Sequence, residues 1–119
     1  MPNVLVVDDE EDVAAFLAYQ LSSQGYTVST ANDGVEAVLK SADMDLDALL
    51  MDIRMPKLDG LNALRIIRRI KPDLPVIMFT GSASNNEMIQ ATRLGANTCL
   101  LKPVNIDYLY KILKDLFIL

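Results

Sequence analysis

Histidine is absent from the 119 residues of this chain, and cysteine occurs only once, as Cys99. Without histidine the chain cannot build a histidine-based zinc site, a Ser-His catalytic pair or a phosphohistidine of its own. A single cysteine cannot form an internal disulfide. Any chemistry that the protein performs must therefore come from carboxylates, hydroxyls and lysine.

Positive charge is also scarce, because the chain carries a net charge of −5. This balance argues against nucleic acid as a direct partner, since binding a duplex requires a basic surface. One basic cluster lies along a predicted helix, and we expect it to form the solvated face of that helix. Its members are Arg65, Arg68, Arg69 and Lys71.

Long apolar runs are missing as well. No run approaches the roughly 20 residues of a membrane span, and the first three residues lack the basic region of a signal peptide. We therefore expect a cytoplasmic protein with no membrane partner. Hydrophobic residues make up 51% of the chain, which fits one compact domain over residues 1–119 with a single core.

The stretch 47–56 organises the rest of the chain. Its apolar run, 48–51, is too short for a helix and is typical of a strand buried on both faces of a parallel sheet. The run ends on Asp52, which places a carboxylate at the edge where open α/β sheets bind ligands. Pro56 and the pair Asp59-Gly60 then predict a shaped loop before the next helix.

Five strands, each followed by a helix, are predicted in order along the chain. The strands cover 4–7, 26–30, 48–52, 75–80 and 98–101. Apolar residues recur at helical spacing after each strand: Val13, Phe16, Leu17 and Leu21; Val35, Val38, Leu39 and Ala42; Leu61, Leu64, Ile67 and Ile70; Met88, Ala91 and Leu94; Ile106, Leu109, Ile112, Leu113 and Leu116. This alternation predicts an α/β fold, a doubly wound (βα)5 three-layer sandwich. We expect a parallel five-stranded sheet in the flavodoxin-like order 2-1-3-4-5.

Polar side chains follow the predicted strands, and in a parallel sheet all of these ends lie at one edge. Asp8, Asp9, Asp52, Thr80 and Lys102 should therefore converge. Two carboxylates about 4 Å apart repel by roughly 4 kcal/mol at an effective dielectric near 20, so the acidic members call for a cation. Mg²⁺ suits such a cluster, because it binds few carboxylates together with water and phosphoryl oxygens.

Phosphoryl chemistry follows from this set of residues. A carboxylate such as Asp52 can accept a phosphoryl group directly and form an acyl phosphate. The ammonium of Lys102 and the hydroxyl of Thr80 can then hold the phosphoryl oxygens.

Five blocks of the sequence carry a resemblance to a known family. They are 6–10 (VVDDE), 51–56 (MDIRMP) with 59–60 (DG), 79–81 (FTG), 95–96 (GA) and 101–103 (LKP). In this order and spacing the chain resembles the receiver domain of a two-component response regulator, similar to the single-domain chemotaxis type, from about residue 3 to residue 117. The resemblance implies a phosphorylation-dependent signalling switch rather than an enzyme, one that assists its own phosphotransfer and autodephosphorylation.

The resemblance also implies a role for each matching residue. Asp52 would be the phosphoacceptor, and Mg²⁺ would be bound by Asp9, Asp52 and the backbone carbonyl of Arg54. Asp8 would act through a metal-bound water. Thr80 and Lys102 would contact the phosphoryl group, and the peptide bond between Lys102 and Pro103 would be cis, a form that X-Pro bonds adopt at little cost.

The implied partners are proteins. A histidine kinase or a histidine phosphotransfer protein would donate the phosphoryl group, and the output would go to an unknown downstream target or to a missing effector domain. Tyr108 or Tyr110 on the last helix, with Ile118 and Leu119, is a candidate contact for such a partner.

Two residues depart from the family pattern. The family commonly places Tyr or Phe three residues before the lysine, and here that position is Cys99. We therefore expect switching through ordering of the loops after Asp52 and Thr80 and through the Lys102 ion pair, with little aromatic switching. Arg54, two residues after Asp52, is expected to shade the acyl phosphate and so to affect its lifetime.

Three alternatives remain open. A flavodoxin-like FMN carrier shares the strand order, but its phosphate would be repelled by the acidic loop 8–12. A Mg²⁺-dependent phosphohydrolase would need a second carboxylate where Arg54 stands. A pseudo-receiver would bind a partner without phosphorylation, and Cys99 keeps this alternative open.

Overall fold

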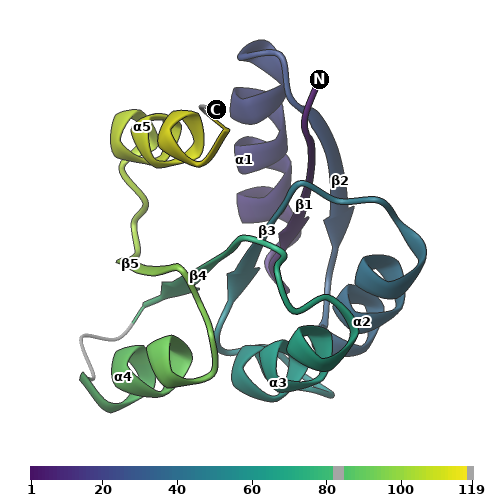
Figure 1. Ribbon diagram of the computed structural model, residues 1–119. Helices are drawn as coiled ribbons and strands as arrows, with labels where there is room; N and C mark the ends of the chain where they lie inside the picture. The colour runs from purple at the N-terminus through teal and green to yellow at the C-terminus, as the bar shows by residue number, and fades with distance from the viewer. Residues whose placement is uncertain (82–84, 118–119) are drawn as a thin grey trace.

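A computed structural model describes residues 1–81 and 85–117 of the chain (Figure 1). Five strands alternate with five helices in this part of the chain. The strands are β1 (Asn3–Val7), β2 (Thr27–Ala31), β3 (Ala48–Asp52), β4 (Val76–Thr80) and β5 (Thr98–Leu101). The helices are α1 (Glu11–Ser23), α2 (Gly34–Asp43), α3 (Gly60–Ile70), α4 (Asn85–Arg93) and α5 (Ile106–Phe117).

The strands form one parallel sheet in the order β2-β1-β3-β4-β5, so the predicted order 2-1-3-4-5 is confirmed. Strand bounds differ from the predicted ones by about a residue, as in β2, which begins at Thr27 rather than at residue 26. The register pairs Val7 with Met51, and Asp52 with Phe79. Because neighbouring strands end within about a residue of one another, the residues that follow them share one edge.

Helices cover both faces of the sheet (Figure 1). One hydrophobic cluster joins the sheet to α2, α3 and α4, and a second joins it to α1 and α5. All five residues of β3 and of β4 are buried. Strands enclosed on both faces read as continuous apolar runs, which is why the run 48–51 identified β3 from sequence.

The predicted apolar faces of three helices are partly wrong. Phe16 on α1, Val35 and Leu39 on α2, and Ile70 on α3 are 53%, 45%, 59% and 43% exposed. The helix α2 instead buries small residues, Gly34, Ala37 and Ser41. Small residues allow a close approach: a Cβ built on Gly34 would overlap the backbone carbonyl of Leu58. Hydrophobic periodicity cannot detect such a contact, because these residues carry little apolar weight.

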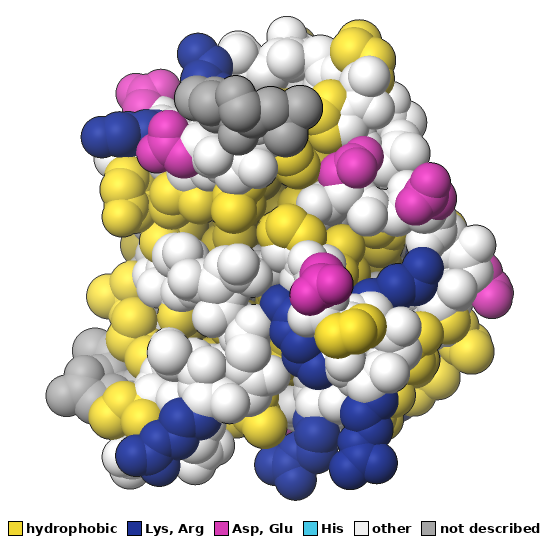
Figure 2. All heavy atoms as spheres, viewed as in Figure 1, with side chains coloured by type: hydrophobic (Ala, Val, Ile, Leu, Met, Phe, Trp, Pro, Cys, Tyr) yellow, Lys and Arg dark blue, Asp and Glu magenta, His cyan; other side chains and the backbone are white. Residues whose placement is uncertain are grey.

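The basic cluster on α3 is only partly the solvated face that was predicted. Figure 2 shows Lys and Arg side chains gathered along the lower edge of the molecule, over α3 and α4. Arg65 and Arg69 are exposed. Arg68 is half-buried and donates hydrogen bonds to the carbonyl of Gly95 from Nε (3.1 Å) and Nη2 (2.7 Å). This arginine therefore joins α3 to the turn before β5.

Ser41 is a buried polar residue whose hydroxyl has no hydrogen-bond partner within the described ranges. We expect Ser41→Ala to raise the free energy of unfolding by about 1 kcal/mol, because it removes a desolvated hydroxyl and improves helix propensity. Urea denaturation of wild type, Ser41→Ala and the exposed control Ser22→Ala on α1 would measure this gain. A loss of stability in Ser41→Ala would contradict the prediction.

None of the helices in residues 1–81 and 85–117 is both long and apolar enough to cross a bilayer.

Candidate functional site

The residues predicted to converge do so at the C-terminal edge of the sheet. Asp52 is the last residue of β3, Asp8 directly follows β1, and Asp9 comes next. Asp8 is fully buried and Asp52 is 6% exposed, whereas Asp9 is exposed. The backbone N–H of Glu10 donates a 3.0 Å hydrogen bond to Asp8 Oδ1, which fixes that carboxylate at the start of α1.

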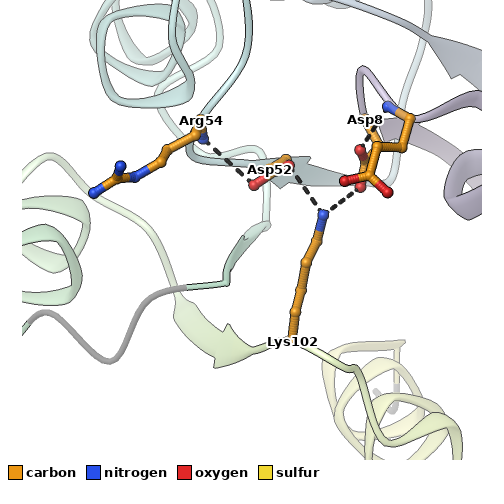
Figure 3. Close-up of polar contacts among 5 residues, drawn as sticks. Asp8, Asp52, Arg54 and Lys102 are labelled. Carbon is orange, nitrogen blue, oxygen red and sulfur yellow. Dashed lines mark hydrogen bonds and ion pairs between the residues drawn. The ribbon is translucent and has the colours of Figure 1, made fainter.

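Lys102 joins the two buried carboxylates (Figure 3). Its Nζ lies 2.7 Å from Asp8 Oδ2 and 2.9 Å from Asp52 Oδ2. The residue directly follows β5, and its backbone N–H donates to the carbonyl of Thr80, 2.8 Å away. The peptide bond between Lys102 and Pro103 is cis, the form that the resemblance implies. Lys102, whose backbone is held by the end of β4, therefore bridges Asp8 and Asp52, which lie 94 and 50 positions away in sequence.

The loop after β3 is held against the site by backbone contacts. The N–H of Gly60 donates to the carbonyl of Ile53 at 2.6 Å, and Asp59 caps α3 by accepting from the N–H of Asn62 at 2.8 Å. Lys57 adopts a positive φ of 68°. Its Nζ lies 3.4 Å from Oδ2 of Asp33, the N-cap of α2. The segment 53–59 is thus anchored at both ends and in the middle.

Charge and burial oppose each other at this edge. Burial raises the pKa of the Asp52 carboxyl, Lys102 counteracts that rise, and the charge of Asp8 adds to it. Burial alone would lower the pKa of Lys102, but its hydrogen bonds to Asp8 and Asp52 raise it. The lysine is therefore held as an ammonium, and the site still carries more negative than positive charge.

The three aspartates are placed to hold a metal ion. Asp8, Asp9 and Asp52 each offer a carboxylate oxygen, and these oxygens lie within 4.8 Å of one another. Carboxylate oxygens are hard donors, which suit a divalent cation such as Mg²⁺. Lys102 pairs with two of the three carboxylates, so few protein ligands remain, and Mg²⁺ commonly completes its coordination with several waters. The backbone N–H of Arg54 lies 3.4 Å from Asp52 Oδ1. The backbone carbonyl of Arg54 as a fourth ligand stays a prediction.

Three other candidates, Thr80, Cys99 and Tyr108, differ in how deeply they are buried. Thr80 ends β4 and is buried at the same edge. Cys99 is half-buried on β5 and packs against the cluster under α2, α3 and α4; burial, and then the charge of Glu87, raises the pKa of its thiol. Tyr108 is 53% exposed on α5. Their roles in switching or output stay predictions, and Ile118 lies outside the described residues, as does Leu119.

Glu87, in the first turn of α4, was not predicted from sequence. In the unmodified protein the Arg54 side chain points away from Asp52 (Figure 3). Its Nη2 lies 2.8 Å from Glu87 Oε1. Shading of the acyl phosphate by Arg54 stays a prediction. The two residues are 33 positions apart, and no local pattern links them. Only the tertiary placement of α4 beside the loop after β3 could have revealed the pair.

A doubly wound parallel sheet with three carboxylates, a hydroxyl and a lysine gathered at one edge is an α/β domain whose site suits a divalent cation and phosphoryl oxygens. The sequence profile of the response regulator receiver domain matches residues 4–114. The chain belongs to the response regulator receiver domain family.

Known proteins that resemble the chain include response regulators and receiver structures. The response regulator MprA of Mycobacterium ulcerans is 42% identical over 106 residues, which cover 89% of this chain and 46% of MprA. A CheY-like receiver domain protein from Methanospirillum hungatei superposes with a TM-score of 0.92 at 30% identity, covering 98% of this chain and 94% of that one. The response regulator TrrA of Thermotoga maritima, in complex with Mg²⁺-BeF, superposes with a TM-score of 0.89 at 32% identity, covering 98% and 100%.

The chain spans less than half the length of the curated relatives that it matches.

Proposed function

We propose that the chain is a phosphorylation-dependent switch of a two-component phosphorelay, with Asp52 as the phosphoacceptor. The observation that carries the proposal is the position of Asp52: it ends a fully buried central strand, its Oδ2 lies 2.9 Å from Lys102 Nζ, and it shares a three-carboxylate cluster. A histidine kinase or a histidine phosphotransfer protein in the cytoplasm is the proposed donor.

The proposed transfer is a displacement at phosphorus. A carboxylate oxygen of Asp52 attacks the phosphorus of a phosphohistidine; the new P–O bond forms as the P–N bond breaks, and the electron pair stays on the imidazole of the donor. Lys102 holds the negative charge that the phosphoryl oxygens bring to the site, and Thr80 offers a hydroxyl to them. Autodephosphorylation is the attack of water on the same phosphorus, with Asp52 leaving as carboxylate.

Mg²⁺ is the proposed cofactor, held by Asp9, Asp52 and the backbone carbonyl of Arg54, with Asp8 completing the acidic cluster through a water. When bound, it would neutralise charge on the phosphoryl oxygens. Two similar structures support this assignment: TrrA is in complex with Mg²⁺-BeF, and a response regulator protein from Burkholderia pseudomallei contains a phosphorylated aspartic acid and a calcium ion.

The test is intact-mass analysis after incubation with acetyl phosphate, with and without Mg²⁺. We expect a base-labile phosphoryl adduct on wild type that requires Mg²⁺ and is lost in Asp52→Asn. Asp115→Asn, an exposed position on α5, serves as the matched control and should keep the adduct. An adduct that survives in Asp52→Asn would refute the assignment of the acceptor.

Absence of an adduct under every condition would favour the pseudo-receiver, which binds its partner without phosphorylation. The half-buried Cys99 at the usual aromatic position is the observation behind this second candidate. The FMN carrier has less support, because Asp8 and Asp9 place negative charge where the FMN phosphate would have to bind.

A further inference from the structure

Arg54 is attached to two parts of the molecule at once. Its backbone N–H lies 3.4 Å from Asp52 Oδ1, while its guanidinium points away from the site (Figure 3). Nε (3.2 Å) and Nη2 (2.8 Å) both donate to Glu87 Oε1. Arg54 therefore connects the candidate phosphoacceptor to the first turn of α4.

The two members of this pair differ in their freedom. The Arg54 side chain is 72% exposed, whereas that of Glu87 is only 18% exposed. Glu87 lies in the first turn of α4. Its negative charge, after burial, contributes to the raised pKa of the Cys99 thiol. An exposed, flexible arginine can change partners more easily than the enclosed glutamate can move.

We propose that Arg54 is a positioning residue that exchanges partners: its guanidinium pairs with Glu87 in the resting protein and turns to the phosphoryl group when Asp52 is modified, which frees the first turn of α4. The proposal rests on the phosphoacceptor role of Asp52 and deepens it. In this proposal, Arg54 and Glu87 connect the site to α4. The connection does not require an aromatic side chain at position 99, where this chain has cysteine.

Charge favours this exchange. A phosphoryl group at neutral pH carries about −1.5 to −2 and three strong acceptor oxygens, while the unmodified carboxylate carries −1. The planar fork of arginine binds such oxygens in pairs, and in the resting protein both donors reach only one oxygen of Glu87. Glu87 keeps a favourable place after release, because it lies near the positive N-terminus of α4.

The direct test observes the Arg54 guanidinium. Beryllofluoride with Mg²⁺ serves as a stable mimic of the phosphoryl group, and ¹⁵N spectra report the Nε–H resonances. We expect the Arg54 resonance and the backbone amides of 86–90 to shift, while Nε–H of Arg68, which donates to the carbonyl of Gly95, stays in place as an internal control. Binding of beryllofluoride with an unmoved Arg54 resonance overturns the exchange and leaves the phosphoacceptor role intact. Absence of binding overturns both.

A double-mutant cycle provides the second arm. Glu87→Gln weakens the resting pair and should raise the affinity for beryllofluoride about two- to fivefold, the range expected for an exposed ion pair. Arg54→Ala should lower the affinity and change the lifetime of the acyl phosphate. The double variant should behave like Arg54→Ala, because the proposal has Glu87 affect beryllofluoride binding only through its pair with Arg54. If the effects of the two substitutions on the affinity for beryllofluoride were additive, Arg54 and Glu87 would not act through partner exchange, and the proposal would be overturned.

Discussion

Lys102→Met should lower the free energy of unfolding by about 2–3 kcal/mol at pH 7 without Mg²⁺, and added Mg²⁺ should restore much of this loss. The substitution leaves Asp8 and Asp52 buried without their ammonium partner. Removing one partner of a buried ion pair costs about 3–5 kcal/mol. We expect a smaller loss because the Lys102 side chain is 18% exposed and the carboxylates can take up protons.

The pH dependence of this variant follows from the sign of the shifts. The pKa of Asp52 in the folded protein is raised above 3.8 by burial, and loss of the lysine raises it further. A carboxyl with a raised pKa binds more protons in the fold than in the unfolded chain, so stability falls as pH rises through the interval above 3.8. The gap between variant and wild type should therefore close near pH 4 and widen towards pH 7.

The pKa of Lys102 is also raised in the fold, so its effect on stability has the same sign but lies in a much higher pH interval. Its pKa is raised above 10.5 in the fold, so its contribution is complete below 10.5 and is lost only at still higher pH. Urea denaturation at pH 4 and pH 7, with and without Mg²⁺, would measure these differences. Lys111→Met, exposed on α5, is the matched control. Equal stabilisation of Lys102→Met and wild type by Mg²⁺ would contradict the argument, because it would mean that the cation does not take over the role of the ammonium.

Much of the fold and of the candidate site could be predicted from sequence, because topology alone brings strand ends together. The apolar run 48–51 ended on Asp52, and three further predicted strands, 4–7, 75–80 and 98–101, likewise ended at or next to a polar candidate residue. In a parallel sheet the C-terminal ends of all strands lie at one edge, so residues as far apart in sequence as Asp8 and Lys102 are brought to that edge. The structure places these two side chains 2.7 Å apart.

The remainder depended on contacts that no local pattern records. Arg68 lies on a helix that reads as a solvated basic face, yet the turn at Gly95 approaches it and accepts its hydrogen bonds. The pairing of Arg54 with Glu87 depends on where α4 lies relative to the loop after β3. On α2, close packing selected small residues over the larger apolar ones, so periodicity indicated a face that is partly exposed.

These contacts also decide how rigidly the site is built. Asp52 and Thr80 lie on strands buried on both faces, and the loop after β3 is fastened by Gly60 and by the Lys57–Asp33 pair. A reacting carboxylate gains most from being held in place, because small misplacements of reacting groups cost large factors in rate. The burial that holds Asp52 also raises its pKa, and the lysine and the expected cation offset this effect.

Gly60→Ala, where the loop after β3 meets α3, should therefore be strongly destabilising. Gly60 begins α3, and a Cβ built there would overlap the backbone carbonyl oxygen of Asp52 and lie 2.8 Å from Ile53 Cα. Both neighbours are backbone atoms at the end of β3, so no side chain can move aside. We expect a loss of about 3 kcal/mol in the free energy of unfolding, at the upper end for overpacking.

The sign of this result is informative, because Gly→Ala in an unobstructed helix normally gains up to about 1 kcal/mol. Gly81→Ala is the matched control: among residues 1–81 and 85–117 no heavy atom lies within 4 Å of the added Cβ, so stability should change by less than about 0.5 kcal/mol. Phosphorylation by acetyl phosphate should slow by at least about tenfold in Gly60→Ala, measured under conditions where the variant is folded, since the strand end carrying Asp52 must shift. A Gly60→Ala protein with wild-type stability and wild-type phosphorylation would show that the close approach of α3 to β3 is not what positions the acceptor.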